Sequence, residues 1–573
     1  MPDLLEATPT TAEGAQPRGA DLLAQTLRTR GVSTMFTLPG GHILQLLDAA
    51  DREGLRVVDT RHEGAAVLAA EGWALATGAT GVAAVTAGPG FANGLIGLMD
   101  AGAWSVPLLM IAGRTGTDRQ GRGAVMDVDQ RAIAAPAAKW AASCASPGLV
   151  PQYTARALYE ARAGCPGAVY LDVPWDVMRA TPAALDIAPA EFPDDPPAPA
   201  GSADALGSAL ASLRAAKRPV ILAGSGAFWS GAGEAIARFA ELSGIPVITA
   251  SAARGVVADS HPLCLGSLVH AGIALPSSDC VLVLGSAFNA NVLYGGPPLF
   301  GSEQTIIQVD IDAGRMGGNR RADVAVAGDV TQVVRDLTAG WRTSDSLDAE
   351  WLDQARSLAA ASLQYWDQQI DGHHGRALHA GALAREVAGF ARERCSGDVT
   401  FVADGGDALA WPLAYFYAEN PGRLLTTTTA LGTLGVGMPF AIAAALARPA
   451  EPVFLFVGDG SFGLTAMEVE TAARHGLFIV VIVSNNAGWG DVRHEQDAFF
   501  GPDRHVASNL SPARYDRLAE ALGAAGEHVE QLAEVRPALQ RAVERGGCTV
   551  IDAATDPTVL AELLRVMGSA GLM

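Results

Sequence analysis

An acidic residue and an asparagine pair each follow an apolar segment towards the end of the chain. Asp459 comes directly after the apolar run in 452–460 (PVFLFVGDG), and Asn486 ends the next run, 477–486 (LFIVVIVSNN). Continuous apolar runs of this length are typical of buried parallel strands, and ligands bind beyond the carboxyl ends of such strands. Carboxylate and amide oxygens suit Mg²⁺ or Ca²⁺ completed by phosphate oxygens and water. These residues therefore predict a site for a metal ion and a phosphorylated ligand.

Two glycines beside the acidic residue support the same prediction. Gly458 and Gly460 would let the backbone approach a phosphate closely, and the helix expected after them offers free amide groups at its start. GDGS alone is also typical of a strand end, an Asx turn or a helix cap. Its combination with the asparagine pair is what favours a ligand site.

GDG followed about 25 residues later by NN resembles the diphosphate-binding motif of the thiamine-diphosphate enzymes. The resemblance extends over nearly the whole chain, in that family's order of pyrimidine-binding, central and diphosphate-binding domains. It implies an α/β fold of three doubly wound parallel-sheet domains, with thiamine diphosphate and Mg²⁺ as cofactors. It also implies that the metal is bound by Asp459, the Asn486 side chain and the Gly488 carbonyl, and that Gly458, Gly460, Ser461 and Asn486 lie along the cofactor.

Alternating helical patterns and short apolar runs extend over the 573 residues, as in α/β proteins. A Pro-rich acidic linker at 187–202 and a polar segment at 340–375 divide them. We expect a pyrimidine-binding domain at 18–186, a central nucleotide-binding-like domain at 203–340 and a diphosphate-binding domain at 376–557. The tail at 558–573 has helical spacing of apolar residues, which suits either an apolar lid over the pocket or an ordinary terminal helix.

Glu63 stands at the start of an amphipathic helix in 57–78, where a carboxylate also complements the helix dipole. In the resembled family the matching Glu hydrogen-bonds N1′ of the aminopyrimidine and promotes loss of the thiazolium C2 proton. The resemblance implies this role for Glu63. It places these further residues along the cofactor: Gly88, Pro89, Asn93, Gly405, Gly406, Gly432, Thr433 and Leu434. Because Glu63 and Asp459 lie on different domains, and the family's site forms between subunits, we expect at least a homodimer and, further, a homotetramer.

Several short segments, among them TLPGGHILQLLDAA (37–50) and NNAGWG (485–490), resemble benzaldehyde lyase and the 2-hydroxyacyl-CoA lyases most closely. That resemblance makes His42 a proton-transfer residue, and we predict Glu495 as a second one. The predicted substrate pocket consists of Gly41, Val125, Met126, Trp175, Leu409 and Trp489.

The leading interpretation is a carbon–carbon lyase, reversible as a carboligase, that splits a 2-hydroxyacyl-CoA into an aldehyde or ketone and formyl-CoA. The alternatives are a benzaldehyde-lyase-like enzyme acting on 2-hydroxyketones and an acetolactate synthase. Leu409 stands where benzaldehyde lyase has a Tyr. Acetolactate synthases carry a Gln near 124–130, and Ala124 to Asp127 offer none.

The central block contains three residues that could contact CoA or another nucleotide, namely Arg254, Asp310 and Asp312. A nicotinamide dehydrogenase is disfavoured because GSGAFWSG (224–231) lacks the third Gly of the dinucleotide motif. The presence of Glu63 and Asp459 argues against a non-catalytic binding module.

Composition and net charge limit the kinds of partner that the protein can have. The net charge of −21 argues against nucleic acid, and no apolar run reaches the length of a membrane span. We expect a cytoplasmic protein with a small-molecule substrate. Six scattered cysteines without a CxxC are expected to be reduced core thiols.

Overall fold

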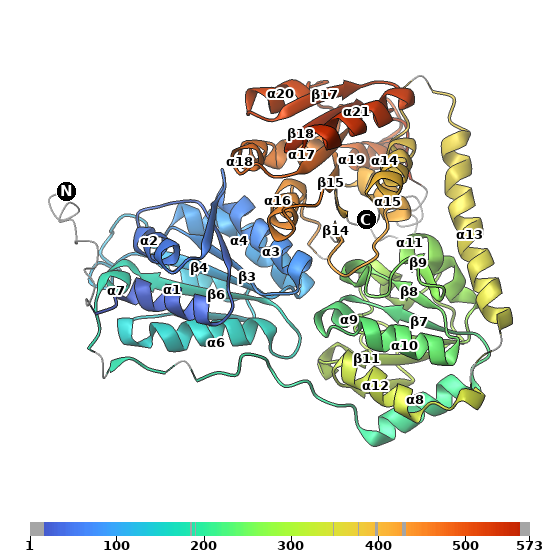
Figure 1. Ribbon diagram of the computed structural model, residues 1–573, viewed down its shortest axis with the longest axis horizontal. Coiled ribbons are helices and arrows are strands. Elements are labelled where there is room, and N and C mark those ends of the chain that lie inside the picture. Colours follow the sequence, from blue (N-terminus) through green and yellow to red (C-terminus); the bar gives the residue numbers. More distant parts are fainter. Residues whose placement is uncertain are drawn as a thin grey trace.

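The described residues fold into three parallel sheets, each with six strands and each in its own domain. The computed structural model describes residues 16–183, 186–189, 191–345, 347, 349–375, 377–395, 399–426 and 431–561. Within these residues every strand pairing between named strands is parallel, and helices cover the sheets, which confirms the predicted α/β fold class. Figure 1 shows the first domain in blue, the central domain in green and the third in orange and red.

The first domain has the strand order β2-β1-β3-β4-β6-β5. Its strands are β1 (Thr34–Thr37), β2 (Arg56–Asp59), β3 (Gly81–Val85), β4 (Leu108–Arg114), β5 (Trp140–Ser143) and β6 (Ala168–Pro174). Its helices are α1 (Gly19–Thr29), α2 (Leu44–Arg52), α3 (Glu63–Thr77), α4 (Pro89–Trp104), α5 (Gln130–Ala134), α6 (Val150–Arg162) and α7 (Trp175–Arg179).

The third domain has the order β14-β13-β15-β16-β18-β17, which repeats the order of the first domain strand for strand. Its strands are β13 (Thr400–Asp404), β14 (Leu424–Thr426), β15 (Val453–Gly458), β16 (Ile479–Asn485), β17 (Ala525–Val529) and β18 (Cys548–Ala554). Its helices are α14 (Ala380–Arg394), α15 (Asp407–Tyr415), α16 (Gly437–Ala447), α17 (Asp459–Thr465), α18 (Glu468–Arg474), α19 (Gly490–Phe500), α20 (Tyr515–Ala521) and α21 (Leu532–Arg545).

The central domain has the order β12-β11-β10-β7-β8-β9, so the order in which strands are added to the sheet reverses between β7 and β10, although the two strands are parallel. Its strands are β7 (Pro219–Ala223), β8 (Val247–Thr249), β9 (Cys264–Ser267), β10 (Cys280–Leu284), β11 (Thr305–Asp310) and β12 (Val324–Ala327). Its helices are α8 (Ala203–Ala215), α9 (Ser225–Trp229), α10 (Gly233–Ser243), α11 (Leu268–Ala271) and α12 (Val330–Gly340), and the long α13 (Ala349–Asp371) leads to the third domain.

The first and third domains share one apolar core. Buried residues of α3 and of α16 belong to the same cluster, with Val67 and Ala443 both fully buried. The two helices approach closely at Gly72, where an added Cβ would lie 2.8 Å from the Phe440 Cα. The absence of a side chain at this position is what allows the helices to pack so closely.

Replacing Gly72 with Val is therefore expected to destabilise the contact between the two domains. Overpacking of this kind typically costs about 1–3 kcal/mol, so the thermal unfolding midpoint should fall. The matched control is Gly207→Ala on α8, where an added Cβ meets nothing within 4 Å. Because Ala is the better helix former, that change should leave the midpoint unchanged or raise it slightly. A Gly72→Val protein as stable as the unmodified one would contradict this account.

The last described residue of the chain packs into the third domain. Ala561 is fully buried in the core of the third domain. The rest of the predicted lid, 562–573, lies outside the described residues, and the domain boundaries stay predictions.

Among the described helices, none is both long enough and apolar enough to cross a membrane.

Candidate active site

The carboxyl ends of three neighbouring strands of the third domain meet at one edge of the sheet. Strands β13, β15 and β16 lie side by side and end at Asp404, Gly458 and Asn485. The backbone of Gly405 lies next to that of Gly458. The Gly488 amide donates to Asp459 Oδ2 at 3.1 Å. The predicted diphosphate and metal segments are thus brought together, as parallel pairing requires.

The predicted metal-binding residues offer a buried carboxylate and a buried amide oxygen that has no hydrogen-bond partner among the described residues. Asp459 is 2% exposed. The Asn486 Oδ1 atom is buried and has no hydrogen-bond partner among the described residues. Buried polar atoms normally have a partner, so an orphaned oxygen beside a buried carboxylate fits a cation. Burial raises the pKa of the Asp459 carboxyl to about 6, although the Gly488 and Gly460 amides lower it in part.

The remaining predicted residues of this edge pack tightly against one another. Ser461 is buried in α17, and Gly460 contacts the Trp489 ring so closely that an added Cβ would lie 2.7 Å from it. Leu409 is half-buried on α15, and its amide donates to the Gly406 carbonyl. The close approach seen at Gly460 is therefore to Trp489, a predicted pocket residue.

A cluster of titratable groups lies beside Gly406. A Cβ added at Gly406 would meet the Asp491 side chain, and His494 Nδ1 lies 3.6 Å from Asp407 Oδ2. Burial raises the pKa of both Asp407 and Asp491 to about 6, and Glu495 adds to the rise at Asp491. Glu495 thus lies close to this cluster, while Asp407 is a candidate that sequence reasoning missed although it directly follows Gly406.

Glu63 is the first residue of α3 and is 7% exposed. Its Oε2 accepts a hydrogen bond from Asn93 Nδ2 at 3.0 Å, so two residues predicted to contact the cofactor contact each other. Gly90 leaves the space beside Oε1, where an added Cβ would lie 3.2 Å away. Pro89 is the first residue of α4, and Gly88 precedes it with φ of 62°.

His42 lies in the turn after β1, at the same sheet edge as Glu63. Its Nδ1 lies 3.4 Å from Thr86 Oγ1, which follows β3, and the preceding Gly41 is exposed. Burial lowers the pKa of the His42 imidazole, so the ring is neutral at neutral pH. Because Nδ1 faces Thr86, Nε2 is the ring nitrogen available to a substrate.

The predicted pocket segment 124–130 holds a residue that sequence reasoning missed. Gln130 is fully buried; its Oε1 accepts from the Gly88 amide, and its Nε2 donates to the Gly113 carbonyl and to Tyr170 Oη. Gln130 thus stands three positions after the segment 124–127, with its side chain occupied by contacts within the protein. Val125 is 78% exposed.

Two further pocket predictions are placed at the same domain edge. Met126 has φ of 62° and packs on Gly88. Trp175 begins α7 directly after β6 and stacks beneath the Arg179 guanidinium at 4.4 Å. Both therefore lie at the carboxyl end of the first-domain sheet, where ligands of such sheets bind.

The segment at 431–435 joins the third domain to the first. Thr433 Oγ1 donates to Asp100 Oδ1 of α4 at 2.8 Å. Gly432 is exposed with φ of 72°, and Leu434 is half-buried. Burial raises the pKa of Asp100 to about 6, which the hydrogen bond from Thr433 lowers in part.

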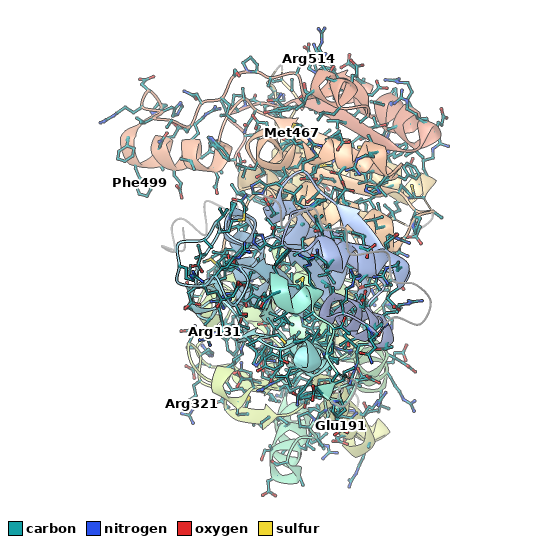
Figure 2. The ribbon with its side chains drawn as sticks, turned by 90° about the vertical axis from the view of Figure 1, so that its left-hand side faces the viewer. Arg131, Glu191, Arg321, Met467, Phe499 and Arg514 are labelled. Carbon is teal, nitrogen blue, oxygen red and sulfur yellow. The ribbon has the colours of Figure 1, made fainter. Side chains whose placement is uncertain are left out.

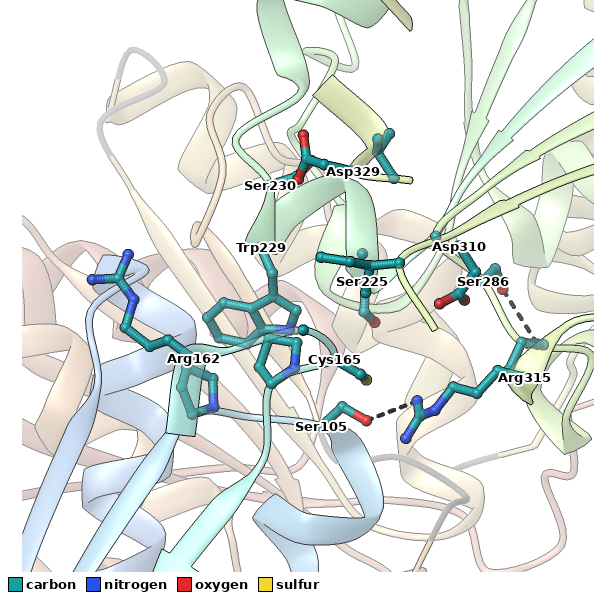
Figure 3. Close-up of a pocket in the computed structure, with 18 of the residues that line it drawn as sticks. Ser105, Arg162, Cys165, Ser225, Trp229, Ser230, Ser286, Asp310, Arg315 and Asp329 are labelled. Carbon is teal, nitrogen blue, oxygen red and sulfur yellow. Dashed lines mark hydrogen bonds between the residues drawn. The ribbon is translucent and has the colours of Figure 1, made fainter. Parts of the chain in front are cut away.

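A cavity of about 340 Å³ lies between the first and central domains, at the point where the strand order of the central sheet reverses. Figure 3 shows Asp310, Trp229 and Cys165 around it, with Arg315 donating across it to Ser105 Oγ at 2.9 Å. Such switch points are where doubly wound sheets bind nucleotides.

The three central-domain predictions fall in different places. Asp310 lines the cavity and is 7% exposed, whereas Asp312 uses its side chain to cap a turn at Gly314. Arg254 does not line the cavity: it is 4% exposed and forms an internal ion pair, with its Nη1 donating to Asp259 Oδ1 at 2.9 Å. The predicted nucleotide contact of Arg254 is therefore corrected: the guanidinium is buried, and both of its terminal nitrogens donate within the protein.

Three family models of thiamine pyrophosphate enzymes, a synonym of thiamine-diphosphate enzymes, match the chain in order. The N-terminal TPP binding domain matches 17–133, the central domain 206–337 and the C-terminal TPP binding domain 404–553. A probable acetolactate synthase of Mycobacterium bovis is 34% identical over 563 residues, which cover 96% of this chain and 98% of the relative. The chain belongs to the thiamine pyrophosphate enzyme family.

Other relatives in this family are similar over most of their length. An acetolactate synthase large subunit of Lactococcus lactis is 31% identical over 512 residues, or 88% of this chain and 87% of the relative. A probable acetolactate synthase large subunit of Methanocaldococcus jannaschii is 30% identical over 555 residues, or 94% and 92%. As a member of this family the protein is an enzyme that uses thiamine diphosphate with a divalent metal such as Mg²⁺.

Proposed function

We propose that this protein is a carboligase that forms acetolactate. The observation that carries the proposal is the similarity over nearly the full length to proteins named acetolactate synthase. Acetolactate contains the atoms of two pyruvate molecules less one CO₂, so the proposed reaction joins two pyruvates and releases CO₂. This similarity favours the third alternative above over the 2-hydroxyacyl-CoA lyase, although both reactions form or break a carbon–carbon bond on the same cofactor.

Each site residue has a proposed task in this reaction. The bound cofactor supplies a carbon nucleophile and an electron sink. Asp459, Asn486 and the Gly488 carbonyl hold the metal ion, and Glu63, fixed by Asn93, holds and returns the proton of the aminopyrimidine. These roles rest on the buried carboxylates and the orphaned Asn486 oxygen.

Residues of the first domain are proposed to contact the substrate and to shape its side of the site. His42 offers its neutral Nε2 to the substrate hydroxyl or to a water. Gln130 fixes the Gly88 backbone that begins α4, which keeps the segment over the cofactor in place. Apolar pocket walls exclude water from the reacting carbon.

The proposed assembly is a homodimer, or a homotetramer made of two such dimers. Large apolar side chains are exposed on α4, on α17 and just after it: Ile96, Met99, Leu464 and Met467 are 41–57% exposed. Figure 2 places Met467 on the outer surface of the third domain. Exposed large apolar side chains of this kind are a feature of protein interfaces. Sedimentation of the full-length protein tests this, and a monomer at micromolar concentration would contradict it.

The experiment for the reaction offers three substrates in parallel, with and without thiamine diphosphate and Mg²⁺. We expect pyruvate to give acetolactate and CO₂ only when both cofactors are present, as followed by NMR. The other arms are a 2-hydroxyacyl-CoA, read by formyl-CoA release, and benzoin, read by benzaldehyde release. Turnover in either of these arms with pyruvate left unchanged would overturn the proposal in favour of the corresponding lyase.

The cavity of the central domain is proposed to hold a nucleotide. Asp310 lies at the end of β11, buried at the switch point, where a carboxylate can accept from a ribose hydroxyl. FAD, ADP and CoA, each titrated by calorimetry, distinguish the candidates. Binding of one of them that Asp310→Asn weakens supports the site, and binding of none removes it.

A further inference from the structure

Asn485 is the first residue of the asparagine pair, and its side chain forms hydrogen bonds through both its nitrogen and its oxygen. Its Nδ2 donates to Asp552 Oδ1 and to the Ala513 carbonyl, each at 2.9 Å, and its Oδ1 accepts from the Ala487 amide at 3.2 Å. The side chain is 9% exposed. It therefore faces away from the ligand side and into the protein, unlike that of Asn486, whose oxygen lacks a partner.

The Ala487 amide that Asn485 holds belongs to a backbone conformation that Ala rarely adopts. Ala487 has φ of 53°, in the left-handed region, and it stands between Asn486 and Gly488, two of the proposed metal ligands. On the other side, Arg493 Nη2 donates to the Ala487 carbonyl at 2.9 Å. A strained residue persists only where its surroundings hold it, and here the Asn485 and Arg493 side chains do so together with the Leu510 amide, which also donates to the Ala487 carbonyl.

Asp552 connects Asn485 to a neighbouring strand. It lies on β18, between β16 and β17, and is fully buried. Its register partner on β16 is Val483, two residues before Asn485 and thus on the same face, and its partner on β17 is His528. His528 Nδ1 lies 3.1 Å from Asp552 Oδ2. The Asp552 carboxylate is thereby fixed from one side and fixes Asn485 on the other.

Asp552 belongs to a cluster with Asp516 and His528 that could suggest a second metal site. The three residues place ligand atoms within 4.8 Å of one another. The Arg514 guanidinium occupies that position with its own positive charge. It lies 2.7 Å from Asp516 Oδ2 and 3.9 Å from Asp552 Oδ2. The carboxylates are therefore already paired with a cation of the protein, and within this cluster it is Asp552 that holds Asn485.

We propose that Asn485 and Asp552 are positioning residues of the Mg²⁺ site, which hold Ala487 in the left-handed conformation that presents the Asn486 side chain and the Gly488 carbonyl to the metal. The inference rests on the proposed metal roles of those two residues. Partners of this kind, one contact behind the ligands, typically contribute about 10- to 100-fold to metal affinity.

The test measures Mn²⁺ affinity by electron paramagnetic resonance, on full-length protein freed of metal and saturated with thiamine diphosphate. Asn485→Ala and Asp552→Ala are each expected to weaken Mn²⁺ binding by about 10-fold or more. Asp552→Asn keeps an oxygen for Asn485 Nδ2 and should restore most of the affinity. Hydrogen exchange at the Ala487 and Gly488 amides should rise in the two alanine variants.

Asp516→Ala is the matched control, because Asp516 is a buried carboxylate of the same cluster that makes no contact with Asn485. It should bind Mn²⁺ like the unmodified protein. The unfolding midpoint of the metal-free variants shows that each is folded, and Asn485→Ala carries the test if Asp552→Ala does not fold. Unchanged Mn²⁺ affinity in a folded Asn485→Ala protein overturns the inference.

Asp459→Asn separates this inference from the proposed function. If Asp459→Asn loses Mn²⁺ binding while Asn485→Ala and Asp552→Ala keep it, only the positioning roles are wrong. If Asp459→Asn binds Mn²⁺ like the unmodified protein, the metal site itself is wrong, and the inference is overturned with it.

Discussion

A Glu63→Gln protein should turn over about 100- to 10,000-fold more slowly than the unmodified enzyme while keeping its fold. The carboxylate is 7% exposed and is held by Asn93 Nδ2, so it is fixed in position rather than free in solvent. Gln fills the same space but cannot take up or return a proton. The measurement is acetolactate formation from pyruvate, together with exchange of the thiazolium C2 proton with D₂O followed by NMR.

Two controls on Glu63→Gln and one further variant make this result specific. The unfolding midpoint and thiamine diphosphate affinity of Glu63→Gln should stay close to those of the unmodified protein, because the metal-binding half of the site is untouched. Asn93→Ala removes only the group that orients Glu63, so a smaller loss of turnover is expected. Unchanged turnover in Glu63→Gln would rule out this residue as the proton-transfer group.

The metal edge of the third domain could be predicted because it depends on short segments whose strand pairing follows from the fold class. GDG and NN end neighbouring strands β15 and β16, as the pattern of two apolar runs separated by a helix predicts. The parallel arrangement alone then places Asp459 beside Asn486. No side chain from elsewhere in the chain is needed for that step.

Residues whose role depends on distant partners could not be predicted in the same way. Gln130 becomes a candidate site residue only because the fold brings Gly88, Gly113 and Tyr170 within hydrogen-bond distance of its side chain. The sequence predicts a nucleotide contact for Arg254, but the fold buries its guanidinium and pairs it within the protein. Its partner Asp259 stands only five positions further on, a signal in the sequence that would have identified the pair.

The substrate was the least predictable feature. The residues shared across the family bind the cofactor, and the same cofactor serves lyases and carboligases alike. What separates them is the pocket wall, which is predicted to include residues of several segments, such as His42, Trp175 and Leu409. One sequence does not show which of these walls selects the substrate, so the full-length similarity to acetolactate synthases decides the proposal.

Replacing Asp459 with Asn is expected to weaken Mg²⁺ binding, measured with thiamine diphosphate present, by about 100-fold or more. Loss of a ligand should cost more than the about 10- to 100-fold typical of residues behind the ligands. The amide keeps one oxygen at 459 but removes the negative charge, and Gly488 still has an acceptor for its amide. Turnover should recover only at high Mg²⁺ concentration, and unchanged affinity would exclude Asp459 as a ligand.

The pH dependence of metal binding gives the same residue a second, independent test. Burial raises the pKa of Asp459 to about 6 in the metal-free protein, and a metal binds only the carboxylate. Above this pKa the affinity should be constant. Below it a proton must leave before the metal can bind, so the affinity should fall by about tenfold per pH unit. Asp459→Asn has no such proton at 459, and its weaker binding should change less between pH 7 and pH 5. A slope as steep as that of the unmodified protein would assign the titration to Asp407 or Asp491 instead, whose pKa values are also about 6.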